Sequence, residues 1–419
     1  MKWLFLAGYL LTILAGLALS WLNLTHQKHC SRRMPPEFIG KLDQNLLQQS
    51  MAYSSAKTRL GMAKTFLHGA LLTIFVFGPW LALVDGWIGR ISESLIINGL
   101  IFFLGLLLVD LVLDIPFDFF RTFVLETRFG FNNTTIGLWW TDRIKSALLS
   151  LIFIGLLTGG SLWLVQGSPR QWWLWVWLFT IMMVLFVQVL APRFIEPLFY
   201  RFEPINSPQL EHRIQNLSRQ AGIRDRRIFK VDASRRTRHA NAYFSGFGRQ
   251  KRIVLFDTLL QQLDTGEILA VLAHEIGHWR HRHISKRLLG TAVLTLGAFY
   301  LAFILLNGGG LPRLIGQEHV SFPAQTLILS LMATIVGFLC TPLRCWLSRR
   351  HEWQADDFAA ELTGEPRLLA EALLKLARNN LATLCPHPWY AWYYYSHPPL
   401  IQRIRELMAR SARGTNQVP

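Results

Sequence analysis

Charge and cysteine are both scarce in this chain of 419 residues. Charged residues make up 16% of it, whereas soluble globular proteins average about 25%, so an ordinary soluble domain does not describe the whole chain. The four cysteines are Cys30, Cys340, Cys345 and Cys385, and they form no CxxC pair. Their spacing therefore indicates neither a zinc site built on thiolates nor a disulfide framework.

Acidic residues are also few. Lys and Arg outnumber Asp and Glu by 43 to 26, which gives a formal net charge of +17. A nucleic-acid-binding protein would gather such an excess in soluble basic patches. Here much of it flanks hydrophobic segments, where it matches anionic lipid headgroups and sets membrane topology. We therefore expect a lipid bilayer, and no nucleic acid, among the partners.

Hydrophobic residues are abundant, at 51% of the chain. Seven stretches are apolar enough to cross about 30 Å of hydrocarbon as helices, which predicts an all-α polytopic membrane protein. The seven lie at 3–21, 66–84, 95–113, 147–165, 172–190, 288–306 and 326–346. The first resembles a signal peptide in position, but its apolar core exceeds the roughly 7–15 residues of such peptides and favours a retained span.

The loops between these stretches alternate in charge. The loops rich in Lys and Arg are 24–65, 114–146 and 191–287, and the poor ones are 85–94, 166–171 and 307–325. Because basic loops stay in the cytoplasm, we expect the N-terminus outside and the C-terminus inside. The protein is then an integral protein, expected in a bacterial inner membrane, with its catalytic site facing the cytoplasm.

Four regions follow from this pattern. The first, 1–190, is an N-terminal membrane domain with five transmembrane helices, and 288–347 holds helices six and seven. Between them, 191–287 is a cytoplasmic segment in which IFKVDAS and RIVLFDTLL predict strands of a small β element. The last region, 348–419, opens on a predicted helix that continues out of the seventh span.

One motif carries chemistry. In VLAHEIGHWRHRH, His274 and His278 lie at i and i+4, so both imidazoles share one helical face and can bind one Zn²⁺ ion. Glu275 follows the first histidine and can take a proton from the attacking water. The alternative is an ordinary polar helix face, but the apolar residues around the motif predict that it is buried.

A catalytic zinc site needs a third protein ligand. His281 and His283 are close in sequence but lie off the face of the histidine pair among cations, so we interpret them as a cytoplasmic flank. In SRRHEWQADDFAAEL, Glu352 and Asp356 share a helical face. One carboxylate can bind metal while the other hydrogen-bonds a ligand imidazole, although a pair of solvated charges would give the same spacing.

Five motifs in a fixed order resemble the type I CAAX prenyl endopeptidase family of integral-membrane zinc metalloproteases. They are FVLETRFGFNNTT, HANAYFSGFGRQKRIVLFDTLL, HEIGHW, SRRHEWQADDFA and YSHPPLIQRI. The resemblance implies that His274, His278 and Glu352 bind one zinc ion per chain. It also implies that Glu275 is the general base and that Asp356 hydrogen-bonds the imidazole of a zinc-binding histidine without touching the metal.

The same resemblance suggests how a peptide substrate is held. It assigns Asn241 to the substrate backbone, His397 to the oxyanion and, more loosely, Arg403 to substrate binding. An asparagine offers both a donor and an acceptor to an extended peptide. A histidine beside Pro398–Pro399 can donate to the oxyanion from a stiffened loop.

The family resemblance also implies a fold of seven helices around a hydrated chamber. Asp110 lies within the third predicted span, where a carboxylate must face protein or water, so it suits a chamber wall. Both metal-binding helices are expected to run on into the membrane from the cytoplasmic side. The zinc would then lie at the membrane surface, within reach of a substrate that is itself tethered to the bilayer.

The predicted function is hydrolysis of peptide bonds in membrane-tethered or prenylated C-terminal (CAAX-type) peptides by a zinc endopeptidase. One alternative is a membrane-protein quality-control protease without prenyl specificity. A metal-gated channel or transporter would also use seven spans and intramembrane aspartates, but it gives no role to a base beside the ligands. A catalytically idle scaffold would not need an intact HExxH motif.

Overall fold

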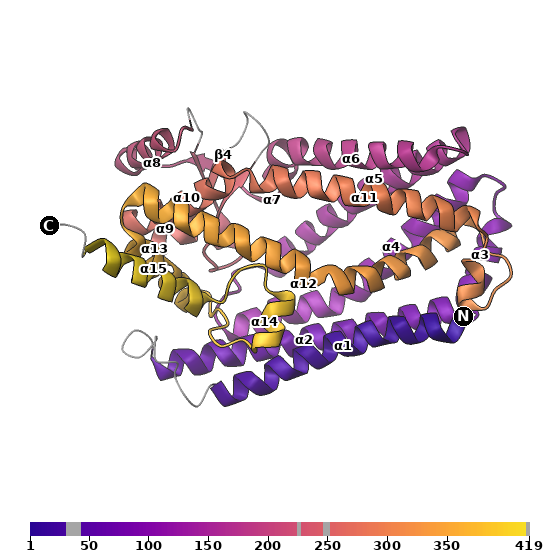
Figure 1. The fold of residues 1–419 in the computed structure, drawn as a ribbon, viewed down its shortest axis with the longest axis horizontal. Coiled ribbons are helices and arrows are strands. Elements are labelled where there is room, and N and C mark those ends of the chain that lie inside the picture. The colour runs from indigo at the N-terminus through magenta and orange to yellow at the C-terminus, as the bar shows by residue number, and fades with distance from the viewer. Residues whose placement is uncertain (31–42, 224–227, 246–251, 416–419) are drawn as a thin grey trace.

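Among the described residues, seven helices are long and apolar enough to cross a membrane, in the number expected. The computed structural model describes residues 1–30, 43–223, 228–245 and 252–415. The seven are α1 (Lys2–Cys30), α2 (Gln44–Phe77), α4 (Leu95–Phe119), α5 (Ile136–Gly167), α6 (Trp172–Leu190), α11 (His283–Asn307) and α12 (Phe322–Thr363). The N-terminus and helix α15 (Leu400–Thr415) lie at opposite ends of this bundle (Figure 1), as an odd number of crossings requires.

The second predicted span, 66–84, was wrong in its bounds. Helix α2 ends at Phe77, and the separate helix α3 (Trp80–Gly89) follows. Gly78 is extended, with φ −86° and ψ −165°, because a residue before proline is pushed out of the helical region. The crossing helix therefore begins earlier, at Gln44, and ends earlier than the hydrophobicity alone predicted.

Three of the crossing helices extend well past their apolar stretches. Helix α4 continues through a π-helical segment, Phe120–Glu126, and α6 continues through Ala191–Ile195 into α7 (Glu196–Phe199). Helix α12 reaches Thr363 without a break, which confirms that the helix predicted after 348 continues out of the seventh span. A single helix thus runs from the predicted membrane span into one of the two ends that lie outside the apolar spans.

The predicted β element is a four-stranded sheet at that end. Its strands are β1 (Phe202–Pro204), β2 (Ile228–Val231), β3 (Ala242–Ser245) and β4 (Arg252–Phe256), in the order β1-β2-β4-β3. Strands β2 and β4 are parallel, whereas β1 and β3 pair antiparallel with their neighbours. Strand β3 therefore stands at an edge, where its outer backbone groups are open to another strand.

Helices cover this sheet and form the main buried core. They are α8 (Pro208–Gln220), α9 (Asp257–Gln262), α10 (Thr265–Arg280), α13 (Pro366–Asn379) and α15 (Leu400–Thr415). Helix α14 (Pro388–Tyr394) packs instead against α12 and α1. Helix α10 begins at a capping box between Asp264 and Glu267. It buries Ile268, Leu272 and Ile276 on one face, and each contributes about 1.5–3 kcal/mol. The HExxH segment thus lies on a fixed helix.

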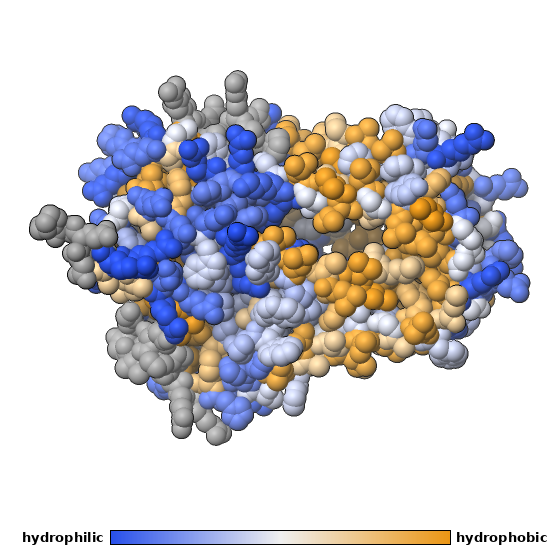
Figure 2. Space-filling view, viewed as in Figure 1, coloured by the Kyte–Doolittle hydropathy of each residue, from blue (hydrophilic) through white to orange (hydrophobic). Residues whose placement is uncertain are grey.

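The outer surface separates an apolar band from two polar ends (Figure 2). A hollow opens between hydrophobic side chains within that band. Helices α1, α2, α12 and α14 line a cavity of about 640 Å³ whose wall includes Tyr9, Ser20 and Lys57. The wall of this cavity therefore mixes polar and apolar side chains of crossing helices, which suits the predicted chamber.

A disulfide that the cysteine spacing did not indicate joins Cys30 to Cys385. The two positions are 355 residues apart in sequence, so no local motif could reveal the pairing. Cys340 and Cys345 are free. The cysteine spacing, which indicated no disulfide framework, therefore did not predict this bond.

Candidate active site

Close packing of α10 against α12 brings the two halves of the site together. A Cβ atom at Gly277 would lie 3.0 Å from Ala355 Cα and 3.1 Å from its carbonyl oxygen, so a larger residue there would push the helices apart. Gly277 lies between His274 and His278 in sequence, and Ala355 lies between Glu352 and Asp356. The glycine in HEIGH therefore lets the histidines reach the carboxylates of α12.

His274, His278 and Glu352 converge on one point. The Nε2 atoms of the two histidines are 3.2 Å apart, and each lies 3.3–3.4 Å from an oxygen of Glu352. In a tetrahedral zinc site with bonds of about 2.0–2.1 Å, ligand atoms lie roughly 3.3–3.4 Å apart. Glu352 Oε2 is also buried without a hydrogen-bond partner. These donor atoms therefore fit a zinc ion.

Behind His274 lies an ion pair. His274 Nδ1 is 2.8 Å from Asp356 Oδ1, and Arg403 donates to both oxygens of Asp356 at 2.6 and 2.8 Å. All three side chains are buried. Burial alone lowers the pKa of His274, but the carboxylates of Asp356 and Glu352 beside it outweigh burial and raise the pKa to about 9. The free imidazole thus holds a proton that a metal must displace.

His278 has a different partner, which the sequence analysis missed. Its Nδ1 lies 3.0 Å from Nδ1 of His283, whose Nε2 lies 2.9 Å from Gln354 Oε1. If His278 binds metal through Nε2, its Nδ1–H donates to His283, and His283 in turn donates to Gln354. No sequence signal predicted this contact, because His283 lies five positions after His278 and no helical spacing relates the two.

A turn between two helices explains the contact between His278 and His283. Helix α10 ends at Arg280, Arg282 adopts the left-handed conformation at φ 55° and ψ 34°, and α11 begins at His283. The expectation that the HExxH helix continues into the membrane is therefore wrong, and only α12 does so. The turn brings His283, which we had interpreted as a cytoplasmic flank, into a buried position against His278.

Glu275 faces a cavity of about 340 Å³ beside the ligands. The cavity is lined from α10 by His274, Glu275 and His278, from α12 by Glu352, and from the start of α11 by Ile284 and Arg287. Burial raises the pKa of Glu275 above its ordinary value, although His274 and His278 act in the opposite direction. A raised pKa suits a group that accepts a proton near neutral pH.

His397 also lines this cavity. Its Nε2 lies 3.4 Å from Glu352 Oε1, and its Nδ1 lies 2.9 Å from the hydroxyl of Ser396. Asn241 precedes edge strand β3, and its side-chain oxygen accepts from the backbone of Ala242. Asn241 is absent from the described cavity lining, where Tyr243 and Phe244 of β3 appear instead.

Arg403 and Asp110 lie apart from the cavity. Arg403 is buried behind the ligands and donates to Asp356, which favours a positioning role over the substrate contact that the resemblance assigned. Asp110 lies on α4 with its Oδ1 3.4 Å from His68 Nδ1. Its side chain is exposed, so the predicted place in a chamber wall stays a prediction.

Comparison with known proteins identifies the family. Residues 23–201 match the model described as "CAAX prenyl protease N-terminal, five membrane helices", and residues 204–411 match the model of peptidase family M48. The chain is 32% identical over 389 residues to the CAAX prenyl protease 1 homolog of Arabidopsis thaliana, with 89% of this chain and 90% of the relative covered. The chain belongs to peptidase family M48.

Two further likenesses agree with this assignment. CAAX prenyl protease 1 of Saccharomyces cerevisiae is 31% identical over 424 residues, covering 93% of this chain and 92% of that protein. The crystal structure of Ste24p from S. mikatae superposes with a TM-score of 0.87 at 29% identity, covering 97% and 98% of the two chains. The protein is therefore an integral membrane metalloendopeptidase with the fold of that structure, and peptides are its substrates.

Proposed function

We propose that this chain is a zinc-dependent endopeptidase that cuts membrane-tethered or prenylated C-terminal peptides at the cytoplasmic face of a bacterial inner membrane. The observation that carries the proposal is the convergence of His274, His278 and Glu352 at tetrahedral zinc spacing beside a base in a cavity that reaches α11. The curated relatives named above are CAAX prenyl proteases, which supports the substrate class.

The metal would be held by His274, His278 and Glu352. When bound, zinc supplies a Lewis acid that polarises the scissile carbonyl and acidifies the attacking water. Glu275 takes the proton of that water and returns it to the leaving amine. His397 is placed to donate a hydrogen bond to the developing oxyanion. Asp356, held by Arg403, keeps His274 oriented with its Nε2 toward the ligand triangle.

The peptide would lie along strand β3. This strand pairs only with β4 in the described sheet, so an extended peptide can add to its free edge through backbone hydrogen bonds. Tyr243 and Phe244 of this strand line the cavity, so a peptide paired with β3 would lie beside it. Asn241 directly precedes the strand. A folded soluble protein cannot present an extended segment to such an edge without unfolding locally.

The cavity wall favours a substrate that approaches from the bilayer. Ile284 and Arg287 of α11 and Ser348 of α12 line it, and both helices lie in the bundle that carries the apolar band. Arg287 can meet lipid headgroups while its stem packs against apolar surface. We therefore place the peptide bond to be cut just at the membrane surface.

The proposal is tested with one peptide sequence in three forms. The purified full chain is incubated in lipid with a quenched peptide that is prenylated, attached to a transmembrane helix, or free. Both tethered forms should be cut faster than the free one, and a zinc chelator should abolish cleavage until zinc is restored. Equal rates for all three forms would contradict the membrane-tethered substrate. Equal rates for the two tethered forms alone would favour the quality-control protease.

A further inference from the structure

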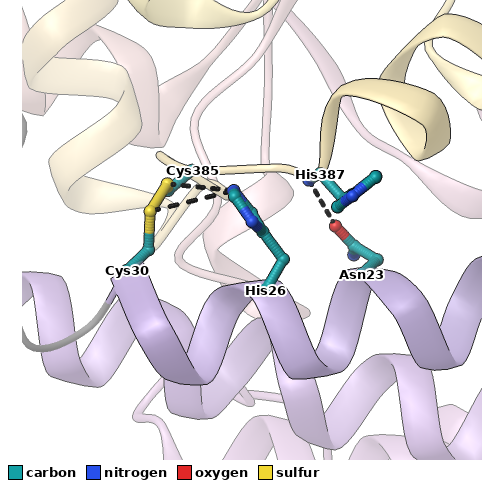
Figure 3. Close-up of a disulfide and its surroundings, with 5 residues drawn as sticks. All are labelled: Asn23, His26, Cys30, Cys385 and His387. Carbon is teal, nitrogen blue, oxygen red and sulfur yellow. Dashed lines mark hydrogen bonds between the residues drawn. A yellow bond between two sulfur atoms is a disulfide. The ribbon is translucent and has the colours of Figure 1, made fainter.

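The Cys30–Cys385 pair lies in surroundings typical of a metal site. His26 Nε2 is 3.9 Å from Cys30 Sγ and 3.7 Å from Cys385 Sγ (Figure 3). The three ligand atoms lie within 4.8 Å of one another. His26 and Cys30 are one helical turn apart on α1, which is the same i, i+4 spacing that places His274 and His278 on one face.

The pair does not depend on the sulfur–sulfur bond to stay together. The backbone N–H of His387 donates to the side chain of Asn23 at 2.9 Å, which anchors the segment before α14 to α1 (Figure 3). The rings of His26 and His387 meet edge to face with centroids 5.1 Å apart. After reduction, the two thiols would therefore remain close to His26.

We propose that Cys30, Cys385 and His26 form a second metal site, which binds a thiolate-preferring divalent ion such as zinc when the disulfide is reduced. Two thiolates and an imidazole are a ligand set that zinc prefers, and the nearby His387 or a water can fill the fourth position. The two states exclude each other, because a sulfur in a disulfide has no charge to give to a metal. The redox state thus selects between a covalent and a metal link.

The exchange between the two states balances with a cellular thiol. A dithiol reductant attacks the Cys30–Cys385 bond, becomes a disulfide itself and leaves two protein thiols. Binding of the metal ion then releases one proton from each thiol. This step rests on the proposed cytoplasmic orientation, since the cytoplasm keeps most thiols reduced.

Another group of metal-binding side chains is a weaker candidate. His68, Asp110 and Asp114 also lie within 4.8 Å of one another. However, Lys64 Nζ is 2.6 Å from Asp114 Oδ1 and already supplies a positive charge there. The His26 group instead offers two sulfur atoms and an imidazole, which are softer ligands and suit zinc better than two carboxylates.

The link joins α1 to the segment that leads to His397. Arg349 of α12 donates to the carbonyl of Tyr395 at 2.7 Å, and the hydroxyl of Tyr393 donates to Phe338 of the same helix at 2.6 Å. Helix α14 is therefore held against α12, and the site at Cys385 holds the start of this segment against α1. Either form of the link would steady the approach to the candidate active site.

Cobalt(II) tests the proposal without reference to proteolysis. A thiolate bound to Co²⁺ gives a ligand-to-metal charge-transfer band, which a site made of histidine and glutamate cannot give. The reduced full chain loaded with Co²⁺ should show this band, and Cys30→Ser and Cys385→Ser should both lose it. Cys340→Ser should keep it, because that free cysteine lies outside the site. The oxidised wild type should lack it.

Two results would overturn the proposal. One is a reduced wild type that binds Co²⁺ at a single site per chain with no thiolate band. The other is a Cys30–Cys385 bond that survives a glutathione buffer at cytoplasmic strength, as seen by mass spectrometry after alkylation. Far-UV circular dichroism of Cys30→Ser establishes that a lost band does not reflect unfolding. Either result would overturn the second metal site without contradicting the proposed protease activity, because the thiolate band does not depend on peptide hydrolysis.

Discussion

The two imidazoles of α10 are held by partners of different kinds. His274 contacts a buried carboxylate that is itself fixed by Arg403, whereas His278 contacts a neutral histidine that leads to Gln354. A carboxylate makes its imidazole a stronger base and holds a proton in the metal-free site. A neutral partner only orients the ring. We infer that His274 sets the strength and pH dependence of metal binding, while His278 sets geometry.

Removing Glu352 should have the largest effect, because both His274 and His278 would lose their shared partner in metal binding. Its two oxygens reach both imidazoles, so Glu352→Ala should lose zinc from the purified protein, as measured by elemental analysis. His281→Ala is the matched control, since His281 lies at the end of α10, three positions after His278, but outside the ligand triangle. Loss of zinc from the His281 variant, with retention in the Glu352 variant, would reverse the assignment of the third ligand.

On the charged side, Asp356→Asn keeps the shape of the side chain but removes its charge. Replacing such a partner typically costs about 10–100-fold in metal affinity, so we expect a loss in that range. Competition with a zinc-binding dye measures it. An unchanged affinity would mean that the Asp356–Arg403 pair supports the fold of α12 and not the ligand.

Metal binding should also depend on pH through His274. Because its pKa is raised to about 9 in the metal-free site, lowering the pH keeps the proton on and weakens metal binding. The zinc affinity should therefore rise about tenfold per pH unit from pH 7 toward 9 and then level off. Asp356→Asn should flatten this rise. A wild-type affinity that is constant across this range would contradict the charged role of His274.

Replacing His283, the partner of His278, should have the smallest effect on zinc affinity. His283→Phe keeps a ring that can stack on His351, as His283 does at 4.1 Å, but it removes the acceptor for His278. A neutral hydrogen bond is worth about 0.5–1.5 kcal/mol, so zinc affinity should fall roughly 2–10-fold. If His283→Phe weakens zinc binding as much as Asp356→Asn, the two partners are equivalent and the comparison fails.

The features that could be predicted from the sequence are local in the chain, whereas those that could not depend on tertiary packing. The spans and the HExxH pair could be predicted because hydrophobic length and i, i+4 spacing are local. Helix α12 was also predictable, since one uninterrupted pattern runs through Glu352 and Asp356. His283 was not, because its position depends on a left-handed turn at Arg282 that no glycine or proline marks. Nor was the Cys30–Cys385 pair, which only the packing of α1 brings together.

One substitution tests the central claim, that Glu275 is the base of a metalloendopeptidase and lies beside the metal ligands. Glu275→Gln keeps the size of the side chain and leaves His274, His278 and Glu352 in place. The purified variant should hold as much zinc as the wild type and hydrolyse a quenched tethered peptide at least about a hundredfold more slowly, the lower range for loss of an acid–base group. Near-wild-type hydrolysis at full zinc occupancy would contradict the assignment.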